Sequence, residues 1–220
     1  MKAAWLRRSG RPRVLVFFAG WGMDEAPFRR LEAREWDVLV YYDFRRLDEA
    51  PCSAEVESYP ERALAAWSLG CAAANWVAQH RAWVLSCALA ISGTIVPEDE
   101  QAGIPARWIE ATAENLTEGG WAKFVRRMCP DAASRMAYDA CPSRRDLPEA
   151  VEELQALRRL PPPGVCVFRA ALVSDQDRIL LPDNQRRCWA RYGVPVRTIA
   201  APHYPFHLWT AWEEVLAWPG

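Results

Sequence analysis

The chain has 220 residues, of which 51% are hydrophobic and 25% charged, and its formal net charge is −1. This composition provides for one sizeable core and excludes a disordered chain. No stretch approaches the roughly 18 consecutive apolar residues of a membrane helix, and the polar, basic segment 1–13 lacks the apolar core of a secretory signal. The composition therefore predicts a soluble cytoplasmic protein without a membrane partner.

The charge balance and the cysteines exclude further classes of protein. The near-neutral net charge argues against a nucleic-acid partner, which would require a basic footprint. The seven cysteines are scattered without a C-x-x-C pair, and their spacing suits neither a disulfide framework nor a zinc site. We therefore expect reduced, mostly buried thiols and no metal or other cofactor.

Two short apolar runs open the chain, at 3–6 and 14–18, and the turn signal Ser9-Gly10 between them favours a hairpin. The second run is continuously apolar, as in a strand that is buried on both faces of a parallel sheet. It ends in a glycine-rich stretch, Ala19-Gly20-Trp21-Gly22. A short helix is then expected over 27–35 and another strand over 37–42.

The rest of the chain alternates between strand and helix signals. Further strands are predicted at 63–67, 83–91, 165–173 and 194–199, and helices at 70–79, 184–191 and from about 210 to 218. Strands separated by helices indicate βαβ units. The sequence therefore predicts an α/β fold with a mostly parallel central sheet.

Segment 93–160 breaks this alternation. It contains no clear strand, but helical stretches at 106–113, 121–128, 130–140 and 148–160. The run 161–164 (Pro-Pro-Pro-Gly) then ends the last helix. We interpret the segment as a helical lid inserted over one end of the sheet, within a single domain that comprises residues 1–220.

The pentapeptide Ala66-Trp67-Ser68-Leu69-Gly70 stands where a buried strand meets a helix. This is the context of a nucleophile elbow, G-x-S-x-G, in which a tight turn lifts the serine hydroxyl off the end of the sheet. Ala66 replaces the first glycine and weakens the match. Ser68 is the candidate nucleophile, and it needs a base.

Three histidines are available as the base. In α/β-hydrolases the chain order is serine, acid, histidine. His203 directly follows the last predicted strand, where such a base is expected, whereas His207 lies at the approach to the final helix and His80 on a helix surface. We therefore select His203.

The acid is expected after the penultimate strand, where Asp175 and Asp177 stand. Asp177 is our first choice and Asp175 the second, for a carboxylate that orients the imidazole and stabilises its charged form. The alternative is that both aspartates only form Asx turns.

An oxyanion hole requires two backbone N–H donors. The N–H of Leu69, which follows the nucleophile, is the first, and the N–H of Trp21 in the glycine-rich stretch is the second. A glycine-rich loop after a first strand can instead cradle a phosphate, but this one matches neither G-x-G-x-x-G nor a P-loop. A serine hydrolase is the favoured interpretation.

Six stretches, spread over nearly the whole chain, carry a family resemblance: 17–24 (Phe-Phe-Ala-Gly-Trp-Gly-Met-Asp), 66–70, 92–94, 124–129, 177–179 with Asn184-Gln185, and 202–204. They resemble the BioG-type pimeloyl-ACP methyl ester esterases of biotin synthesis. The resemblance implies a shortened α/β-hydrolase with a helical lid, which cleaves the methyl ester of pimeloyl-ACP methyl ester to pimeloyl-ACP and methanol. It places nucleophile, base and acid on Ser68, His203 and Asp177; Ser92 stands where an asparagine would be expected.

This resemblance names an acyl carrier protein (ACP) as the partner. Carrier proteins are acidic, so basic pairs on the predicted lid are docking candidates, although each can equally be a solvated helix surface. Four tryptophans could line an acyl channel or only pack the core: Trp21, Trp67, Trp108 and Trp121. The candidate docking pairs are Arg126-Arg127, Arg144-Arg145 and Arg158-Arg159.

Three alternatives remain at this point. One is another serine acyl hydrolase, such as a thioesterase or small-ester carboxylesterase. Another is a hydrolase-like protein that only binds acyl-ACP. The last is an RNA-binding surface made of the arginine pairs.

Overall fold

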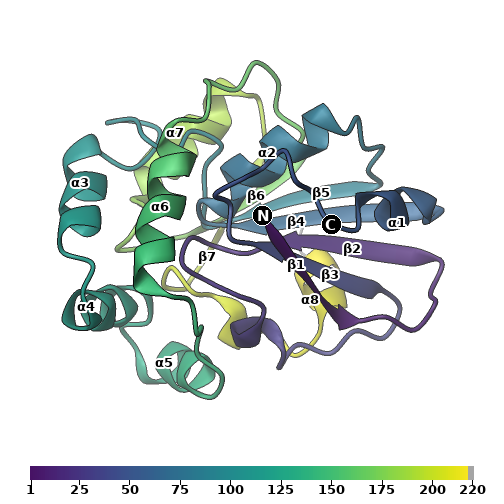
Figure 1. Ribbon diagram of the computed structural model, residues 1–220, viewed down its shortest axis with the longest axis horizontal. Helices are drawn as coiled ribbons and strands as arrows, with labels where there is room; N and C mark the ends of the chain where they lie inside the picture. The colour runs from purple at the N-terminus through teal and green to yellow at the C-terminus, as the bar shows by residue number, and fades with distance from the viewer. Residues whose placement is uncertain (218–220) are drawn as a thin grey trace.

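Seven strands form one sheet in the order β1-β3-β2-β4-β5-β6-β7, in a computed structural model that describes residues 1–217 (Figure 1). All neighbouring strands run parallel except β1, which is antiparallel to β3. The predicted α/β fold with a mostly parallel sheet is therefore confirmed. The strands are β1 (Lys2–Arg7), β2 (Arg13–Phe18), β3 (Asp37–Tyr42), β4 (Glu61–Trp67), β5 (Cys87–Ile91), β6 (Ala170–Ser174) and β7 (Val196–Ile199).

The predicted hairpin between the first two strands is wrong, because β1 pairs with β3 and not with β2. The reason lies in the connecting loop. Asp37, buried at the start of β3, accepts hydrogen bonds from the backbone N–H groups of Ser9, Gly10 and Arg11 at 2.7, 3.0 and 3.2 Å. The loop is thus tied to β3, and β2 keeps parallel neighbours on both sides.

The helix expected over 27–35 is also absent. A three-residue 3-10 helix, η1 (Ala26–Phe28), is followed by turns. The backbone of Glu32 instead bonds the end of the chain: its N–H donates to Thr210 at 2.9 Å and its carbonyl accepts from Trp212 at 2.9 Å. These long-range bonds replace helical ones. A short helix that the sequence did not suggest, α1 (Ser53–Ser58), precedes β4.

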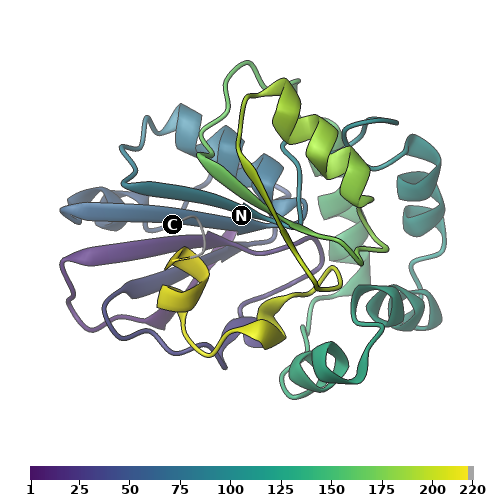
Figure 2. The ribbon, with the colours of Figure 1, turned by 180° about the vertical axis from the view of Figure 1, so that it is seen from behind.

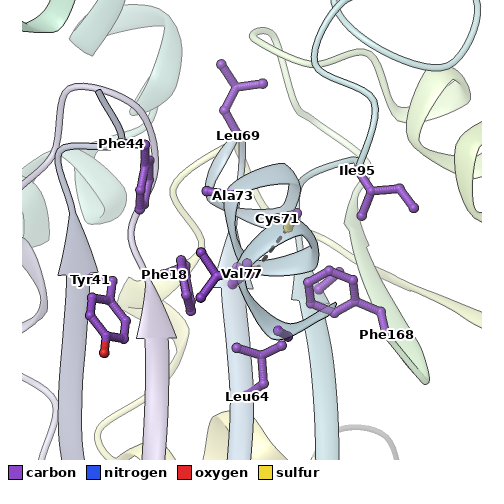
Figure 3. Close-up of a cluster of buried hydrophobic side chains, with 14 of the residues drawn as sticks. Phe18, Tyr41, Phe44, Leu64, Leu69, Cys71, Ala73, Val77, Ile95 and Phe168 are labelled. Carbon is purple, nitrogen blue, oxygen red and sulfur yellow. Dashed lines mark hydrogen bonds between the residues drawn. The ribbon is translucent and has the colours of Figure 1, made fainter. Parts of the chain in front are cut away.

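Helices cover both faces of the sheet (Figures 1 and 2). On one face lie α1, α2 (Gly70–His80) and α7 (Pro182–Arg191), and on the other α8 (Trp212–Ala217) with η1 and a second 3-10 helix, η2 (Phe206–Leu208). Figure 3 shows the first core, where α2 contributes Ala73 and Val77 beside Phe18 and Leu64 of the sheet. The last predicted helix matches α8, but its expected end at Trp218 lies outside the described residues.

Four helices connect β5 to β6: α3 (Ala106–Glu114), α4 (Glu118–Met128), α5 (Ala132–Asp139) and α6 (Leu147–Arg158). We call them the four-helix segment. Three of them begin at a side chain that accepts a backbone hydrogen bond, as N-caps do: Thr117, Asp131 and Asp146. The segment gathers at the end of the sheet where the parallel strands finish (Figure 1). Within residues 1–217 the structure contains no helix long and apolar enough to cross a membrane.

Candidate active site

Ser68 occupies a strained turn between β4 and α2. Its φ is 57°, in the left-handed region that a residue with a side chain adopts only at a cost. Gly70 allows the turn to sit tightly against the end of β2, since a Cβ there would lie 2.1 Å from the carbonyl oxygen of Ala19. The local geometry is that of a nucleophile elbow, as the pentapeptide predicts.

The structure brings Ser68, His203 and Asp177 into one hydrogen-bonded chain. The imidazole Nε2 of His203 lies 2.9 Å from the hydroxyl of Ser68, and its Nδ1 lies 2.6 Å from Oδ2 of Asp177. An ionised carboxylate only accepts hydrogen bonds, so Nδ1 carries the proton and Nε2 is left to accept the serine proton. Ser68 is 6% exposed, His203 1% and Asp177 4%, so this chain of hydrogen bonds is largely buried.

The carboxylate of Asp177 is held by several donors besides the imidazole. Its Oδ1 accepts the backbone N–H groups of Ile179 and Leu180 at 2.8 and 2.9 Å, and its Oδ2 accepts Nε2 of Gln185 at 2.9 Å. Asp175 is exposed, and it is Asp177 that contacts the imidazole. The Asx turn that we considered as an alternative therefore coexists with the contact to His203.

The other two histidines lie elsewhere. His80 is the exposed last residue of α2 and stacks on Trp76 with ring centroids 3.7 Å apart. His207 lies in η2, ahead of α8, and its Nδ1 is 3.3 Å from the carbonyl oxygen of Tyr204.

The glycine-rich loop after β2 lies against the nucleophile. A Cβ on Gly20 would meet the ring of Trp67 at 2.8 Å and the Cβ of Ser68 at 3.3 Å, so only glycine permits this approach. Trp21 and Leu69 line the same cavity as Ser68. Within residues 1–217 the structure gives neither of their backbone N–H groups a hydrogen-bond partner. Two unpaired donors beside a serine suit an oxyanion better than a phosphate, because the loop leads only into the short η1.

A cavity of about 560 Å³, which includes its open mouth, begins at Ser68 and His203 and extends under the four-helix segment. Its wall is mainly apolar. A second hollow between α3 and α4 shares Trp108, Thr112, Phe124 and Arg127 with it, so the two hollows adjoin these side chains. Trp121, a further channel candidate, packs instead against Trp21, with ring centroids 6.0 Å apart. The apolar lining consists of Trp21, Trp67, Leu69, Ile104, Trp108, Ile109, Phe124, Leu154 and Ile179.

The three arginine pairs differ in what they offer a partner. Arg126, Arg127, Arg144 and Arg159 are exposed. The side chain of Arg145 is only 5% exposed and pairs with Asp43 and Glu153 at 3.3 Å each. Arg158 is paired with Glu98 and Glu110. Arg145 therefore serves inside the fold, which its position in a basic pair did not reveal.

Two buried polar residues were not among the predicted site residues. Gln185 bonds Asp177 from the first turns of α7, and Glu153 bonds the loops after β2 and β3 from α6, so neither belongs to a recognised catalytic motif. Gln185 was noted only within the family resemblance. All seven cysteines are free thiols, as expected, but the expectation that most are buried is wrong: Cys71, Cys129 and Cys188 are buried and the other four are half-buried. Among residues 1–217 no group of three or more His, Cys, Asp or Glu side chains is arranged to hold a metal ion.

This sheet, with its covering helices, is that of an α/β-hydrolase. An esterase from Thermogutta terrifontis superposes with a TM-score of 0.71 over 99% of this chain and 91% of its own, at 14% identity. A family model described as "Pimeloyl-ACP methyl esterase BioG" matches residues 1–215, and the chain belongs to this family.

Two relatives are closer in sequence. The crystal structure of BioG from Haemophilus influenzae superposes with a TM-score of 0.86 and 32% identity, over 98% of this chain and all of that one. A protein of Bacteroides fragilis named "Malonyl-[acyl-carrier protein] O-methyltransferase" is 36% identical over 88% of this chain. The chain spans about two fifths of the length of that relative.

Proposed function

We propose that this protein hydrolyses the methyl ester of pimeloyl-ACP methyl ester to pimeloyl-ACP and methanol, as a step of biotin synthesis. Membership of the BioG family supports the substrate. The observation that carries the chemistry is the chain of hydrogen bonds from Asp177 through His203 to Ser68, which opens into an apolar cavity. The Bacteroides fragilis relative is named for methyl transfer to an acyl carrier protein. That name agrees with a substrate that carries a methyl ester on the same kind of carrier.

The proposed mechanism has two halves. Ser68 Oγ attacks the ester carbonyl while Nε2 of His203 takes its proton, and the backbone N–H groups of Trp21 and Leu69 stabilise the oxyanion. The tetrahedral intermediate collapses, and the proton on His203 leaves with methanol. Water then attacks the acyl-enzyme with His203 as base, and Ser68 leaves with the proton from His203. The product is the carboxylic acid, which ionises by releasing its own proton to solvent. Asp177 orients and stabilises the imidazole throughout.

The cavity suits one end of a long acyl chain. In the substrate the methyl ester and the carrier thioester lie at opposite ends of the pimeloyl chain. The apolar wall favours binding of the methylene groups. We place the carrier end of the substrate at the adjoining hollow between α3 and α4. Arg126, Arg127, Arg144 and Arg159 are the exposed docking candidates for the acidic carrier. Arg145 and Arg158 are engaged within the protein.

The first experiment compares the wild type with Ser68→Ala on purified pimeloyl-ACP methyl ester, read by mass. Ser86→Ala is the matched control, because Ser86 is exposed just before β5, at the end of the sheet where the parallel strands begin. We expect the wild type and Ser86→Ala to remove one CH2 from the substrate mass and Ser68→Ala to leave it unchanged. Cleavage by Ser68→Ala would contradict the assigned nucleophile.

Two comparisons separate the alternatives. Cleavage of the carrier thioester in preference to the methyl ester would indicate a thioesterase. A fluorophosphonate probe should label the wild type and not Ser68→Ala, whereas a protein that only binds acyl-ACP would not be labelled. No hydrolysis and no labelling of the wild type would overturn the proposed function.

A further inference from the structure

Glu153 is a fully buried carboxyl group on α6, outside the chain formed by Ser68, His203 and Asp177. Its Oε2 accepts the backbone N–H of Gly22 at 3.2 Å, and its Oε1 accepts that of Phe44 at 2.9 Å. Arg145 is its ionic partner, with Nη1 3.3 Å from Oε2. Glu153 thus joins the four-helix segment to the loops that follow β2 and β3.

The loop 20–24 receives further hydrogen bonds from the same part of the chain. The indole Nε1 of Trp21 donates to the carbonyl oxygen of Ala150 at 2.6 Å. Ser143 donates its hydroxyl to the carbonyl of Gly22 at 3.0 Å, and the backbone N–H of Arg144 donates to Asp24 at 2.9 Å. Residues 143–153 therefore hold this loop from several directions.

These contacts restrain the backbone next to one N–H group, that of Trp21. The N–H of Gly22 belongs to the peptide plane between Trp21 and Gly22, so its hydrogen bond to Glu153 restrains ψ of Trp21. The indole bond to Ala150 restrains the side chain of the same residue. Together they hold the side chain of Trp21 and the peptide plane that follows it. They thereby limit how far the preceding plane, which carries the proposed oxyanion donor, can turn, and such donors act only when they are placed in advance.

Stability alone does not account for a carboxyl group at this position. Burial raises the pKa of Glu153 to about 7, against the opposing pull of Arg145 and the two N–H donors. A buried ion pair often costs more in lost hydration than it returns, and a role in holding one geometry is consistent with that balance.

We propose that Glu153 is a positioning residue, which holds the loop 20–24 so that the N–H of Trp21 points at the developing oxyanion. The proposal rests on the proposed esterase function. In this proposal α6 contributes to the geometry of the active site in addition to packing over it.

The test compares Glu153→Gln with the wild type in steady-state ester hydrolysis. The amide keeps the size of the side chain, but it accepts at one oxygen only and carries no charge. The N–H groups of Gly22 and Phe44 and the guanidinium of Arg145 then compete for that oxygen, which weakens the restraint on the loop. Loss of one oxyanion donor costs about 10²–10³ in kcat, and a misplaced one should cost about 10- to 100-fold. KM should stay within about twofold, because the oxyanion forms only in the transition state.

The matched control is Glu152→Gln, at the neighbouring position of α6. The side chain of Glu152 is 67% exposed and pairs with Arg45, so the control removes the same charge from the outer side of the helix. We expect its kcat to match the wild type. The inhibition constant of butylboronic acid, which forms a tetrahedral adduct with an active serine, should rise in Glu153→Gln by the same factor as kcat falls. A merely structural role for Glu153 would not produce this parallel.

A second variant, Trp21→Phe, removes the indole bond to Ala150 and keeps the backbone donor. It should show lower kcat and weaker boronate inhibition; KM is not compared for this variant, because Trp21 also lines the cavity. The proposal is overturned if Glu153→Gln folds and retains kcat within about twofold, or, should that variant not fold, if Trp21→Phe retains it. Absence of any ester hydrolysis by the wild type would instead refute the proposed function, so the two failures are distinguishable.

Discussion

The indole N–H of Trp67 donates a hydrogen bond of 2.7 Å to the backbone carbonyl of His203. Trp67 directly precedes the candidate nucleophile, and it is almost fully buried. Its ring also fills the space that a side chain on Gly20 would need. One residue at the end of β4 therefore sets the spacing between the serine, the histidine and the glycine-rich loop, three parts of the site that are far apart in the sequence.

The proposed acid is tested by Asp177→Asn, with Asp175→Asn as control. An asparagine can still accept the N–H groups of Ile179 and Leu180, so the turn should persist. While its oxygen keeps those bonds, the asparagine cannot also hold Nδ1 of His203 in the protonated form. Loss of the correct tautomer lowers kcat about 10⁴-fold in comparable sites. We expect that loss in ester hydrolysis, whereas Asp175→Asn, on an exposed side chain, should be near wild type. The reverse pattern would reassign the acid.

Gly70→Ala should destabilise the protein although it places a better helix former at the first position of α2. In a solvent-exposed helix, replacing glycine by alanine would raise the free energy of unfolding by up to about 1 kcal/mol. Here the new Cβ would lie 2.1 Å from the carbonyl oxygen of Ala19, a backbone atom that cannot move without displacing the loop beside Ser68. We expect the free energy of unfolding in urea to fall by about 3 kcal/mol, at the upper end of overpacking costs.

The control for this change is Gly164→Ala, where a Cβ meets nothing within 4 Å. Its unfolding midpoint should stay close to that of the wild type. Equal midpoints for Gly70→Ala and Gly164→Ala would mean that β2 and α2 approach each other less closely than the structure indicates.

Features with a local cause were predictable from the sequence. The runs at 14–18, 38–42 and 63–67 are continuously apolar because parallel strands are buried on both faces. Ser68 and His203 each follow a strand, and parallel strands end at a common edge, so their meeting could be anticipated. The choice of Asp177 over Asp175 rested on the isoleucine two residues after it, Ile179, a pattern that is usual for the orienting carboxylate.

Features that depend on distant partners were not predictable. The pairing of β1 with β3 depends on the loop that binds Asp37, and the absence of helix after η1 depends on bonds between Glu32 and the end of the chain. Arg144 and Arg145 look alike in the sequence. Only the fold makes Arg144 exposed and buries Arg145 beside Asp43 and Glu153.

Glu153 should give the stability of the protein a specific dependence on pH. Its pKa is raised by burial from the ordinary value of 4.5 to about 7 in the folded protein, where Arg145 and Asp43 are the charged groups that face it. The folded state therefore holds the proton more tightly than the unfolded chain. The resulting stability is present below pH 4.5 and is lost as the pH rises through about 7.

A difference of about 2.5 in pKa corresponds to about 3 kcal/mol. The glutamine in Glu153→Gln does not titrate, so the variant should gain about this much stability relative to the wild type between pH 4.5 and pH 8. Urea unfolding of both proteins across that range measures the difference and cancels the titration of all other groups. A difference that does not change with pH would contradict the raised pKa.

Docking of the carrier protein is tested by Arg126→Glu on α4. Arg126 is exposed and adjoins Arg127, which lines the cavity. If an acidic carrier approaches this side, reversing the charge should raise KM for pimeloyl-ACP methyl ester by about three- to tenfold, mainly through slower association. The effect should shrink at about 1 M salt, where the screening length falls to about 3 Å. The KM for a small methyl ester should not change, because that substrate makes no contact with the outer surface.

The control, Arg11→Glu, makes the same change in net charge in the exposed loop before β2, at the end of the sheet where the parallel strands begin. It should leave both KM values unaltered. If Arg11→Glu raised KM for the carrier substrate as much as Arg126→Glu, only overall charge would matter. If neither variant raised KM for the carrier substrate, we would conclude that α4 does not face the carrier. The acyl chain would then enter the cavity at a place other than the hollow between α3 and α4.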